Sequence, residues 1–186
     1  MFSNCENLES IDLSRFNTEN VVEMEELFLS CINLENINLD NFVFNKVEDM
    51  SYMFGNCIKI KEMKMGNSES TFENLKKMYG MFYCCANLEN FEMIGNEDDN
   101  NEKVMNNLED MSLLFAECEK LKQFKFPKIN TYKDINMNNM FLNCISIKNA
   151  DFSFSFSHID KKISMLQTRI VCSKIAEISV LLIYLI

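Results

Sequence analysis

The chain has 186 residues, with 28 acidic against 18 basic side chains and a formal net charge of −10 at pH 7. This length suits one domain or one repeat array. With 47% hydrophobic and 25% charged residues, the composition is that of a folded soluble protein, which argues against both wholesale disorder and a polytopic membrane protein. The basic residues form no run, so nucleic acid is a poor candidate partner.

Two absences bear on where the protein resides. The N-terminal segment Met1–Glu6 has neither a positive region nor an apolar core, so we expect no signal peptide. None of the Asn residues begins an Asn-x-Ser/Thr sequon, which disfavours passage through a glycosylating secretory pathway. Both observations keep the cytoplasm open as an alternative location.

One motif recurs six times along the chain: a Phe, two spacers, a Cys, two spacers and an aliphatic residue. Its copies are Phe2–Leu8, Phe28–Leu34, Phe54–Ile60, Phe82–Leu88, Phe115–Leu121 and Phe141–Ile147. Their Phe positions lie 26, 26, 28, 33 and 26 residues apart, which gives a 26-residue unit with two insertions. The longer insertion holds the acidic stretch Gly95–Glu102. A repeat of this length predicts stacked copies that bury one continuous core.

The apolar residues before each Cys follow helical spacing. Val21, Met24, Leu27, Phe28 and Cys31 fall within an arc of about 120° at 100° per residue, which predicts one buried face of a short helix. The same positions recur in the segments 47–57, 75–85 and 108–118. In the last unit Asp134 replaces the first aliphatic residue, so we expect that helix to begin late.

After each Cys the apolar spacing changes to L-x-x-I-x-L, whose final alternation predicts a short strand with one buried face. These segments are Leu8–Leu13, Leu34–Leu39, Ile60–Met65, Leu88–Met93, Leu121–Phe126 and Ile147–Phe152. The two patterns together predict an α/β solenoid of about six short helix–strand repeats over residues 1–152, with the strands in one parallel sheet and the helices on the convex wall.

The segments Leu8–Val21 and Val47–Cys57 resemble the BspA-type leucine-rich repeat of bacterial and protist surface proteins, a family also known for a 26-residue repeat in mycoplasma and related lipoproteins. The resemblance covers Met1 to about Asp151. The Phe-Asn-Thr element is intact at Phe16, partly kept at Phe42 and replaced at Ile129. The resemblance implies a leucine-rich-repeat solenoid displayed at a cell surface and used for adhesion or for binding macromolecules, and it carries no catalytic residues to transfer.

The eight Cys residues favour packing over chemistry. Six of them occupy one phase of the repeat and none forms a Cys-x-x-Cys pair, so we expect a column of buried structural thiols in place of disulfides or zinc ligands. Cys84 and Cys172 lie outside the column. Because Cys85 already takes the buried position, we expect Cys84 to point away from the core and to be the more reactive thiol, although a bystander role fits it better.

We expect no enzyme, metal site or cofactor. The single His158 follows the last clear repeat and has no acid or nucleophile at a catalytic spacing. The acidic insertion lacks the alternate ligand spacing and the glycine turn of a calcium loop. Most of the 14 Met residues fall at core positions of the repeat, which indicates packing.

Spacer positions of the predicted strands form two columns on the concave face. The first contains Glu9, Glu35, Lys61, Glu89, Lys122 and Lys148, and the second contains Asp12, Asn38, Lys64, Glu92, Lys125 and Asp151. We expect opposite charges one repeat apart to pair: Glu35 with Lys61, Lys61 with Glu89, Glu89 with Lys122, Lys64 with Glu92, and Glu92 with Lys125.

Two interpretations of these columns stay open. One is a solvated face whose pairs each stabilise the stack by a few tenths of a kcal/mol. The other is a polar surface for a protein ligand; a sugar site would be expected to show exposed aromatic residues, and the columns contain none. The candidate ligand contacts are Glu9, Glu35, Lys61, Lys64, Glu89, Glu92, Lys122, Lys125 and Lys148.

The two ends depart from the repeat. The chain opens at Met1 within a unit, which predicts either further upstream repeats or edge-to-edge self-association. Residues 153–186 form a divergent tail whose apolar residues follow a helical stripe, and we expect an amphipathic capping helix there. The final apolar run Ile178–Ile186 is shorter than the roughly 20 residues that a membrane span needs.

The leading hypothesis is therefore a non-catalytic leucine-rich-repeat interaction module that resembles cell-surface adhesins and binds a protein or another macromolecule through its concave sheet face. The first alternative is an intracellular protein-interaction scaffold built on the same solenoid. The second is a truncated repeat fragment without an independent function.

Overall fold

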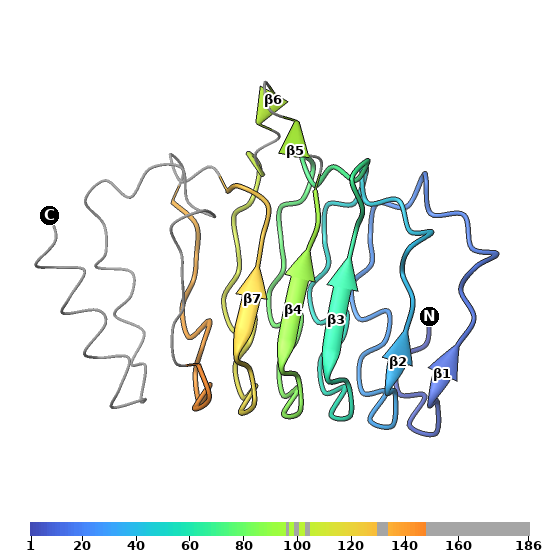
Figure 1. The fold of residues 1–186 in the computed structure, drawn as a ribbon, viewed down its shortest axis with the longest axis vertical. Helices are drawn as coiled ribbons and strands as arrows, with labels where there is room; N and C mark the ends of the chain where they lie inside the picture. Colours follow the sequence, from blue (N-terminus) through green and yellow to red (C-terminus); the bar gives the residue numbers. More distant parts are fainter. Residues whose placement is uncertain (96, 99–100, 103–104, 130–133, 148–186) are drawn as a thin grey trace, which may run out of the picture.

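The computed structural model describes residues 1–95, 97–98, 101–102, 105–129 and 134–147. In this part of the chain each repeat forms one rung, and the rungs lie side by side in a stack (Figure 1). One side of the stack carries the strands and is called the sheet wall; the opposite side is called the turn wall. The expected capping helix, His158, Cys172 and Lys148 all lie outside the described residues.

The sheet wall consists of short parallel strands. They are β1 (Ser10–Ile11), β2 (Asn36–Ile37), β3 (Glu62–Met65), β4 (Asn90–Met93) and β7 (Gln123–Lys125). β1 pairs with β2, and β4 lies between β3 and β7. The single sheet predicted from the sequence is therefore wrong for the described residues, because no strand ladder joins β2 to its neighbour β3 (Figure 1).

The acidic insertion forms its own small element. β5 (Glu97–Asp98) and β6 (Asn101–Glu102) pair antiparallel, with Glu97 opposite Glu102 and Asp98 opposite Asn101. This hairpin projects from the upper end of the rungs in Figure 1. The insertion therefore leaves the stacking of the flanking rungs β4 and β7 intact.

The predicted helices are absent: none of the described residues is in a helix. The segment 21–31 instead forms consecutive turns whose N–H groups alternate between two kinds of partner. The N–H groups of Met24, Glu26, Phe28 and Ser30 donate to carbonyls of the next rung at 2.8–2.9 Å. Those of Leu27, Leu29 and Cys31 donate to the carbonyl three residues back, at 3.1–3.3 Å. The segments 47–57, 75–85 and 108–118 repeat this alternation.

Each turn segment contains two residues in the left-handed backbone region. They precede the Cys by one and by five positions, as at Ser30 (φ 59°) and Glu26 (φ 54°). A positive φ at the third position of a turn is the geometry of a type II turn, for which Gly and Asn are preferred. Asn56, Gly80, Asn139 and Asn143 meet this preference, whereas Tyr52, Leu113 and Glu117 do not.

The spacing between rungs explains why turns replace helices. The Phe rings of successive rungs stack nearly parallel, with centroids 5.3–5.7 Å apart from the partly buried Phe2 through the buried Phe28, Phe54, Phe82 and Phe115 to Phe141. Helices packed side by side need about 8–10 Å between their axes. Flat turns can instead keep the strand spacing of about 4.8 Å across the whole rung, and the stack has no wide helical layer to force it into a curve.

The structure confirms the column of buried thiols for five of its six predicted members. The Sγ atoms of Cys31, Cys57, Cys85, Cys118 and Cys144 each donate to the carbonyl of the Phe in the preceding rung, at 2.9–3.1 Å. All five are buried, while Cys5 of the first rung is exposed. The same Phe carbonyls accept the N–H of the Cys in their own rung, so both acceptor positions are used.

Candidate functional site

The outward face of the sheet wall follows the strand alternation. In β3, Glu62 and Lys64 are exposed while Met63 and Met65 are buried in the core. The strand register places Lys64 opposite Glu92 and Glu92 opposite Lys125. The second predicted column therefore lies on this face from Lys64 through Glu92 to Lys125, while its last member, Asp151, falls outside the described residues.

A further outward column was missed in the sequence. It consists of Glu62, Asn90 and Gln123, which are paired neighbours in β3, β4 and β7. These residues directly precede the middle apolar residue of each strand, so the period of two would have placed them outward as well. The signal was present in the alternation and needed only one more position to be counted.

A shallow groove of about 610 Å³ runs over these columns. It crosses β2, β3, β4 and β7, and its floor includes Met63 and Phe91. Its polar lining residues are Asn38, Asp40, Glu62, Lys64, Asn90, Glu92, Gln123 and Lys125. The groove thus contains both signs of charge and several amides on a scaffold held by the parallel ladder.

The first predicted column lies at the start of the strands and outside the groove lining. Glu9, Lys61 and Lys122 are exposed there, and Glu89 is partly exposed. The predicted pair of Glu89 with Lys122 is confirmed, and this contact is the main reason why the pKa of Glu89 lies below its usual range. Glu35 pairs with Lys59 at 3.2 Å instead of with Lys61, so that prediction is wrong.

The pairing in the second column is also partial. Lys125 Nζ lies 3.7 Å from Glu92 Oε1, which confirms that pair. Within the described ranges neither Lys61 nor Lys64 forms an ion pair with Glu89 or Glu92, although Lys61 contributes to the lowered pKa of Glu89. Lys64 therefore lies in the groove without an ion-pair partner among the described residues, although carboxylates line the same groove.

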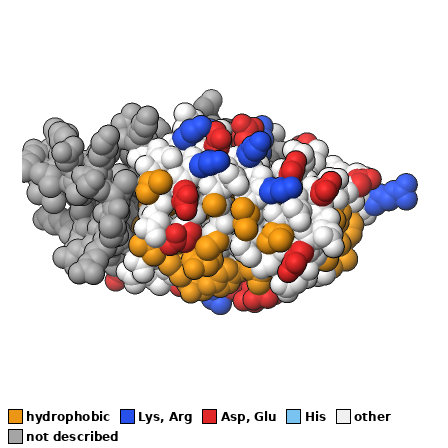
Figure 2. Space-filling model, turned by 90° about the horizontal axis from the view of Figure 1, so that it is seen from below, with side chains coloured by type: hydrophobic (Ala, Val, Ile, Leu, Met, Phe, Trp, Pro, Cys, Tyr) orange, Lys and Arg blue, Asp and Glu red, His pale blue; other side chains and the backbone are white. Residues whose placement is uncertain are grey.

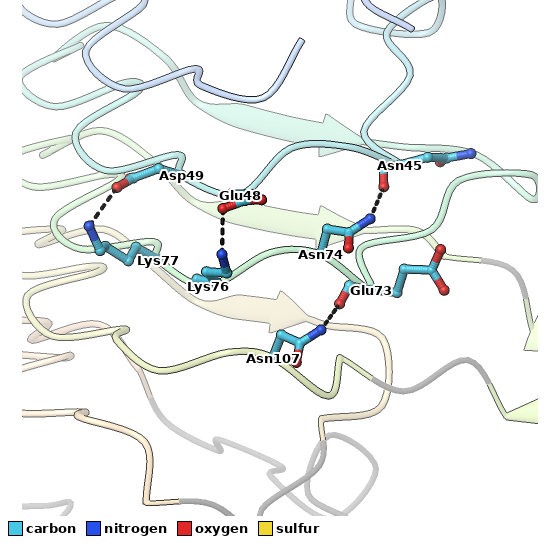
Figure 3. Close-up of polar contacts among 8 residues, drawn as sticks. All are labelled: Asn45, Glu48, Asp49, Glu73, Asn74, Lys76, Lys77 and Asn107. Carbon is cyan, nitrogen blue, oxygen red and sulfur yellow. Dashed lines mark hydrogen bonds and ion pairs between the residues drawn. The ribbon is translucent and has the colours of Figure 1, made fainter. Parts of the chain in front are cut away.

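The turn wall holds a different polar array, which links rungs to one another (Figure 3). Lys77 Nζ lies 3.1 Å from Asp49 Oδ2, and Lys76 contacts Glu48. These bonds with the carboxylates raise the pKa of both lysines. Sequence reasoning missed them because it considered only the strand positions.

Asn side chains extend this array at the edge of the turn wall. Asn74 Nδ2 donates to the carbonyl of Asn45 at 2.6 Å, and Asn107 Nδ2 donates to the carbonyl of Glu73 at 2.7 Å (Figure 3). Each bond joins a residue to the preceding rung. The array therefore stabilises stacking, and we assign it no ligand.

Several of the described thiols lie in surroundings that favour their protonated form. Burial raises the pKa of Cys57 to about 12 and also raises the pKa of Cys84, Cys85 and Cys118. A raised pKa keeps a thiol protonated at neutral pH, which argues against the prediction that Cys84 is the more reactive thiol. In the part of the chain that the structure describes, no three His, Cys, Asp or Glu side chains gather closely enough to hold a metal ion.

A comparison with protein families decides what kind of chain this is. The family described as "Mycoplasma protein of unknown function, DUF285" matches residues 1–93 and again residues 69–176. The chain belongs to the DUF285 family. No curated protein and no solved structure matches it. The two matches agree with the repeat, since a DUF285 unit fits this chain at two places.

One more finding concerns the membrane. Among the residues placed in the structure of this DUF285 chain, no helix has the length and apolar character that a bilayer crossing requires.

Proposed function

We propose that this DUF285 chain is a non-catalytic interaction module that binds a protein ligand in the groove of its sheet wall. The observation that carries the proposal is the groove itself, which spans four neighbouring strands and contains Lys64, a lysine that forms no ion pair with any described residue. A parallel ladder holds β3, β4 and β7 in register, so the backbone positions that carry Glu62, Lys64, Asn90, Glu92, Gln123 and Lys125 are fixed relative to one another. Preorganised polar groups of this kind lower the ordering cost of binding.

The composition of the groove favours a protein over a sugar as the ligand. Glu62, Glu92 and Asp40 lie beside Lys64 and Lys125, so the surface complements a partner that carries both signs of charge. Phe91 lines the groove but is 3% exposed, which leaves little of its ring for stacking on a sugar. Amides such as Asn90 and Gln123 can hydrogen-bond a backbone or side chains of either polarity.

The test compares two double charge reversals with the same change in net charge. Lys64→Glu with Lys125→Glu alters the groove, and Lys59→Glu with Lys120→Glu alters exposed lysines outside it. Binding would be measured by biolayer interferometry against a panel of purified extracellular-matrix proteins. We expect the groove variant to bind its partner about tenfold or more weakly, and the control to bind within about threefold of the wild type. Equal losses in both variants would reject the groove as the binding site.

The relationship to BspA-type leucine-rich repeats and the surface location belong to the same proposal. The resemblance of Leu8–Val21 and Val47–Cys57 supports display at the cell surface, with the turn wall in place of the helices that the repeat predicted. Brief proteolysis of intact cells, followed by mass spectrometry, tests the location. Loss of the chain under conditions that spare cytoplasmic proteins supports surface display.

An intracellular scaffold is the second candidate. Five buried thiols, each donating to a backbone carbonyl, fit a reducing compartment. Protection of the chain in the same proteolysis experiment would favour this candidate, and the groove variants would then be tested against cytoplasmic partners.

A further inference from the structure

Three of the chain's five tyrosines gather on the turn wall. Tyr52, Tyr79 and Tyr83 are each partly exposed. The rings of Tyr52 and Tyr79 have centroids 5.0 Å apart and stand at 84° to each other. Those of Tyr52 and Tyr83 lie 6.2 Å apart at 88°. Two rings therefore stand perpendicular to a third, and the three together are called the tyrosine patch.

Gly80 makes this arrangement possible. It occupies the same repeat position as Tyr52 on the next rung, and both have left-handed backbone. A Cβ atom at Gly80 would lie 2.6 Å from the Tyr52 ring, so the ring occupies the space that a side chain would fill. Tyr79 and Tyr83 flank Gly80 on its own rung, which sets them around the Tyr52 ring.

The repeat itself shows that the fold does not require these tyrosines. The positions equivalent to Tyr52 hold Glu26, Leu113 and Asn139 in other rungs, and those rungs keep the same turns. The stacked core aromatic residues are all Phe and are buried, whereas the tyrosines lie outside that stack. The tyrosine patch is therefore an addition to a wall that is stable with other side chains.

Acidic residues occupy the rungs on both sides of the patch, and the charge of Glu117 acts on Tyr83. Glu26 lies on the preceding rung, where its N–H bonds to the carbonyl of Ser51, next to Tyr52. Glu117 follows Ala116, whose carbonyl accepts the N–H of Cys84 on the adjoining rung. The lysines of this wall, Lys76 and Lys77, are already bonded to Glu48 and Asp49.

The space-filling view agrees with this distribution of charge. Figure 2 shows a continuous hydrophobic area on the side of the stack away from the sheet, with acidic side chains at its borders, while most of the visible lysines lie on the opposite side. Neither Glu26 nor Glu117 forms an ion pair within the described residues, and the carboxylate of Glu117 accepts a hydrogen bond from the uncharged Asn143 at 2.7 Å. The charge that the patch leaves open to a partner is therefore negative.

We propose that the tyrosine patch is a second binding surface, and that it takes a Lys-bearing or Arg-bearing segment of a partner protein. The cation lies against the tyrosine rings, whose faces attract positive charge, and Glu26 and Glu117 complete its neutralisation. Tyr and Arg are also the residues that most often dominate protein interfaces. Burial, together with hydrogen bonding to Tyr79, raises the pKa of Tyr52 to about 12, so its ring stays neutral over the physiological range.

The experiment uses a short end-capped peptide, Gly-Arg-Gly-Arg-Gly, and the same peptide with citrulline in place of arginine. Binding to the ¹⁵N-labelled full chain is followed by NMR through the amide signals of Gly55 and Gly80, which lie beside the Tyr52 ring. We expect saturable shifts of both signals with the arginine peptide, and at least about fivefold weaker binding of the citrulline peptide. Equal binding of both peptides would overturn the proposal.

Variants that keep the net charge distinguish binding at the tyrosine patch from a general attraction of the cationic peptide to a chain of charge −10. Tyr79→Ala and Tyr83→Ala leave the net charge unchanged. Each is expected to lower the affinity for the arginine peptide by about fivefold. Ile58→Ala is the matched control, because Ile58 is 38% exposed and apolar but does not belong to the patch. Unchanged affinity in both tyrosine variants would refute the proposal.

Tyr79→Leu and Tyr83→Leu keep the apolar volume while removing the aromatic face, so they test the idea even if the alanine variants unfold. Their binding should be weakened as in the alanine variants, with an unchanged melting curve. Shifts confined to the amides of Lys64 and Glu92 would place the peptide in the sheet-wall groove, which overturns this inference and leaves the proposed function standing.

Discussion

The two walls of the stack pair the backbone N–H and C=O groups of neighbouring rungs in different ways. On the sheet wall extended residues pair in parallel, yet no ladder joins β2 to β3. On the turn wall the same four N–H groups of every rung from the second to the fifth donate to the next rung, as Met50, Tyr52, Phe54 and Asn56 do to the fourth. The continuous hydrogen bonding of the molecule therefore lies in the turns, and the strands are the less regular wall.

The walls also differ in what they offer a partner. The sheet wall has a groove with mixed charge, where Lys125 pairs with Glu92 and Lys64 does not pair within the described residues. The turn wall has aromatic rings bordered by acids. Residues that repeat in every rung serve stacking, whereas residues that break the repeat, such as Tyr52, are the better candidates for function.

The largest effect is expected from the core that both walls share. Phe82 is fully buried, and its ring stacks between those of Phe54 and Phe115. Phe82→Ala should lower the free energy of unfolding by about 3–5 kcal/mol, because it removes a large apolar side chain and leaves a cavity. Urea unfolding followed by circular dichroism measures this. Phe124→Ala is the comparison on the sheet wall, where the ring is only partly buried, and a loss as large as that of Phe82→Ala would contradict the ranking.

Two glycines with positive φ, one beside each wall, allow the stability cost of an added side chain to be compared between the walls. At Gly66, beside the sheet wall, an added Cβ would lie 2.3 Å from the carbonyl oxygen of Ile94, which is backbone and cannot move aside. At Gly80, on the turn wall, the obstacle is the Tyr52 ring, which can swing away. We expect Gly66→Ala to cost about 2–4 kcal/mol and Gly80→Ala about 1–2 kcal/mol. Thermal unfolding of the two variants gives the order, and the reverse order would show that the turn wall is the more rigid one.

A smaller effect on the free energy of unfolding is expected at alkaline pH, where the thiol column can be tested. Burial raises the pKa of Cys57 from 9.0 to about 12, so between these values the unfolded chain has lost the thiol proton while the folded chain keeps it. Unfolding then releases protons, and the free energy of unfolding falls as pH rises, by up to about 1.4 kcal/mol per pH unit for each such thiol. Below pH 9 this contribution is constant.

The measurement is urea unfolding from pH 8 to pH 11, with Cys57→Ala as the comparison. The variant is less stable at every pH, since it loses a hydrogen bond and some packing, but its stability should fall less steeply above pH 9. An identical slope in both proteins would mean that Cys57 ionises as easily in the folded chain as in the unfolded one.

Much of the stacked core could be predicted from local pattern. The Phe and Cys columns, the inward Met63 and the outward Lys64 follow from residues that recur at one phase of the repeat. The prediction of helices was wrong for a physical reason. Turns that close every three or four residues give apolar residues the same spacing as one helical face. The exposed Cys5 was missed because a phase in the repeat does not say whether another rung covers it.

By itself the sequence determined the 26-residue unit, the residues that face inward and the order of charges along each strand, because these depend on period and phase alone. The tertiary structure decided the rest. Turns form in place of helices because rungs about 5.5 Å apart form N–H bonds to carbonyls 25 to 32 residues away, and no local window contains both partners. The tertiary structure also chose Lys59 over Lys61 for Glu35, and brought together Tyr52, Tyr79 and Tyr83 from two different rungs.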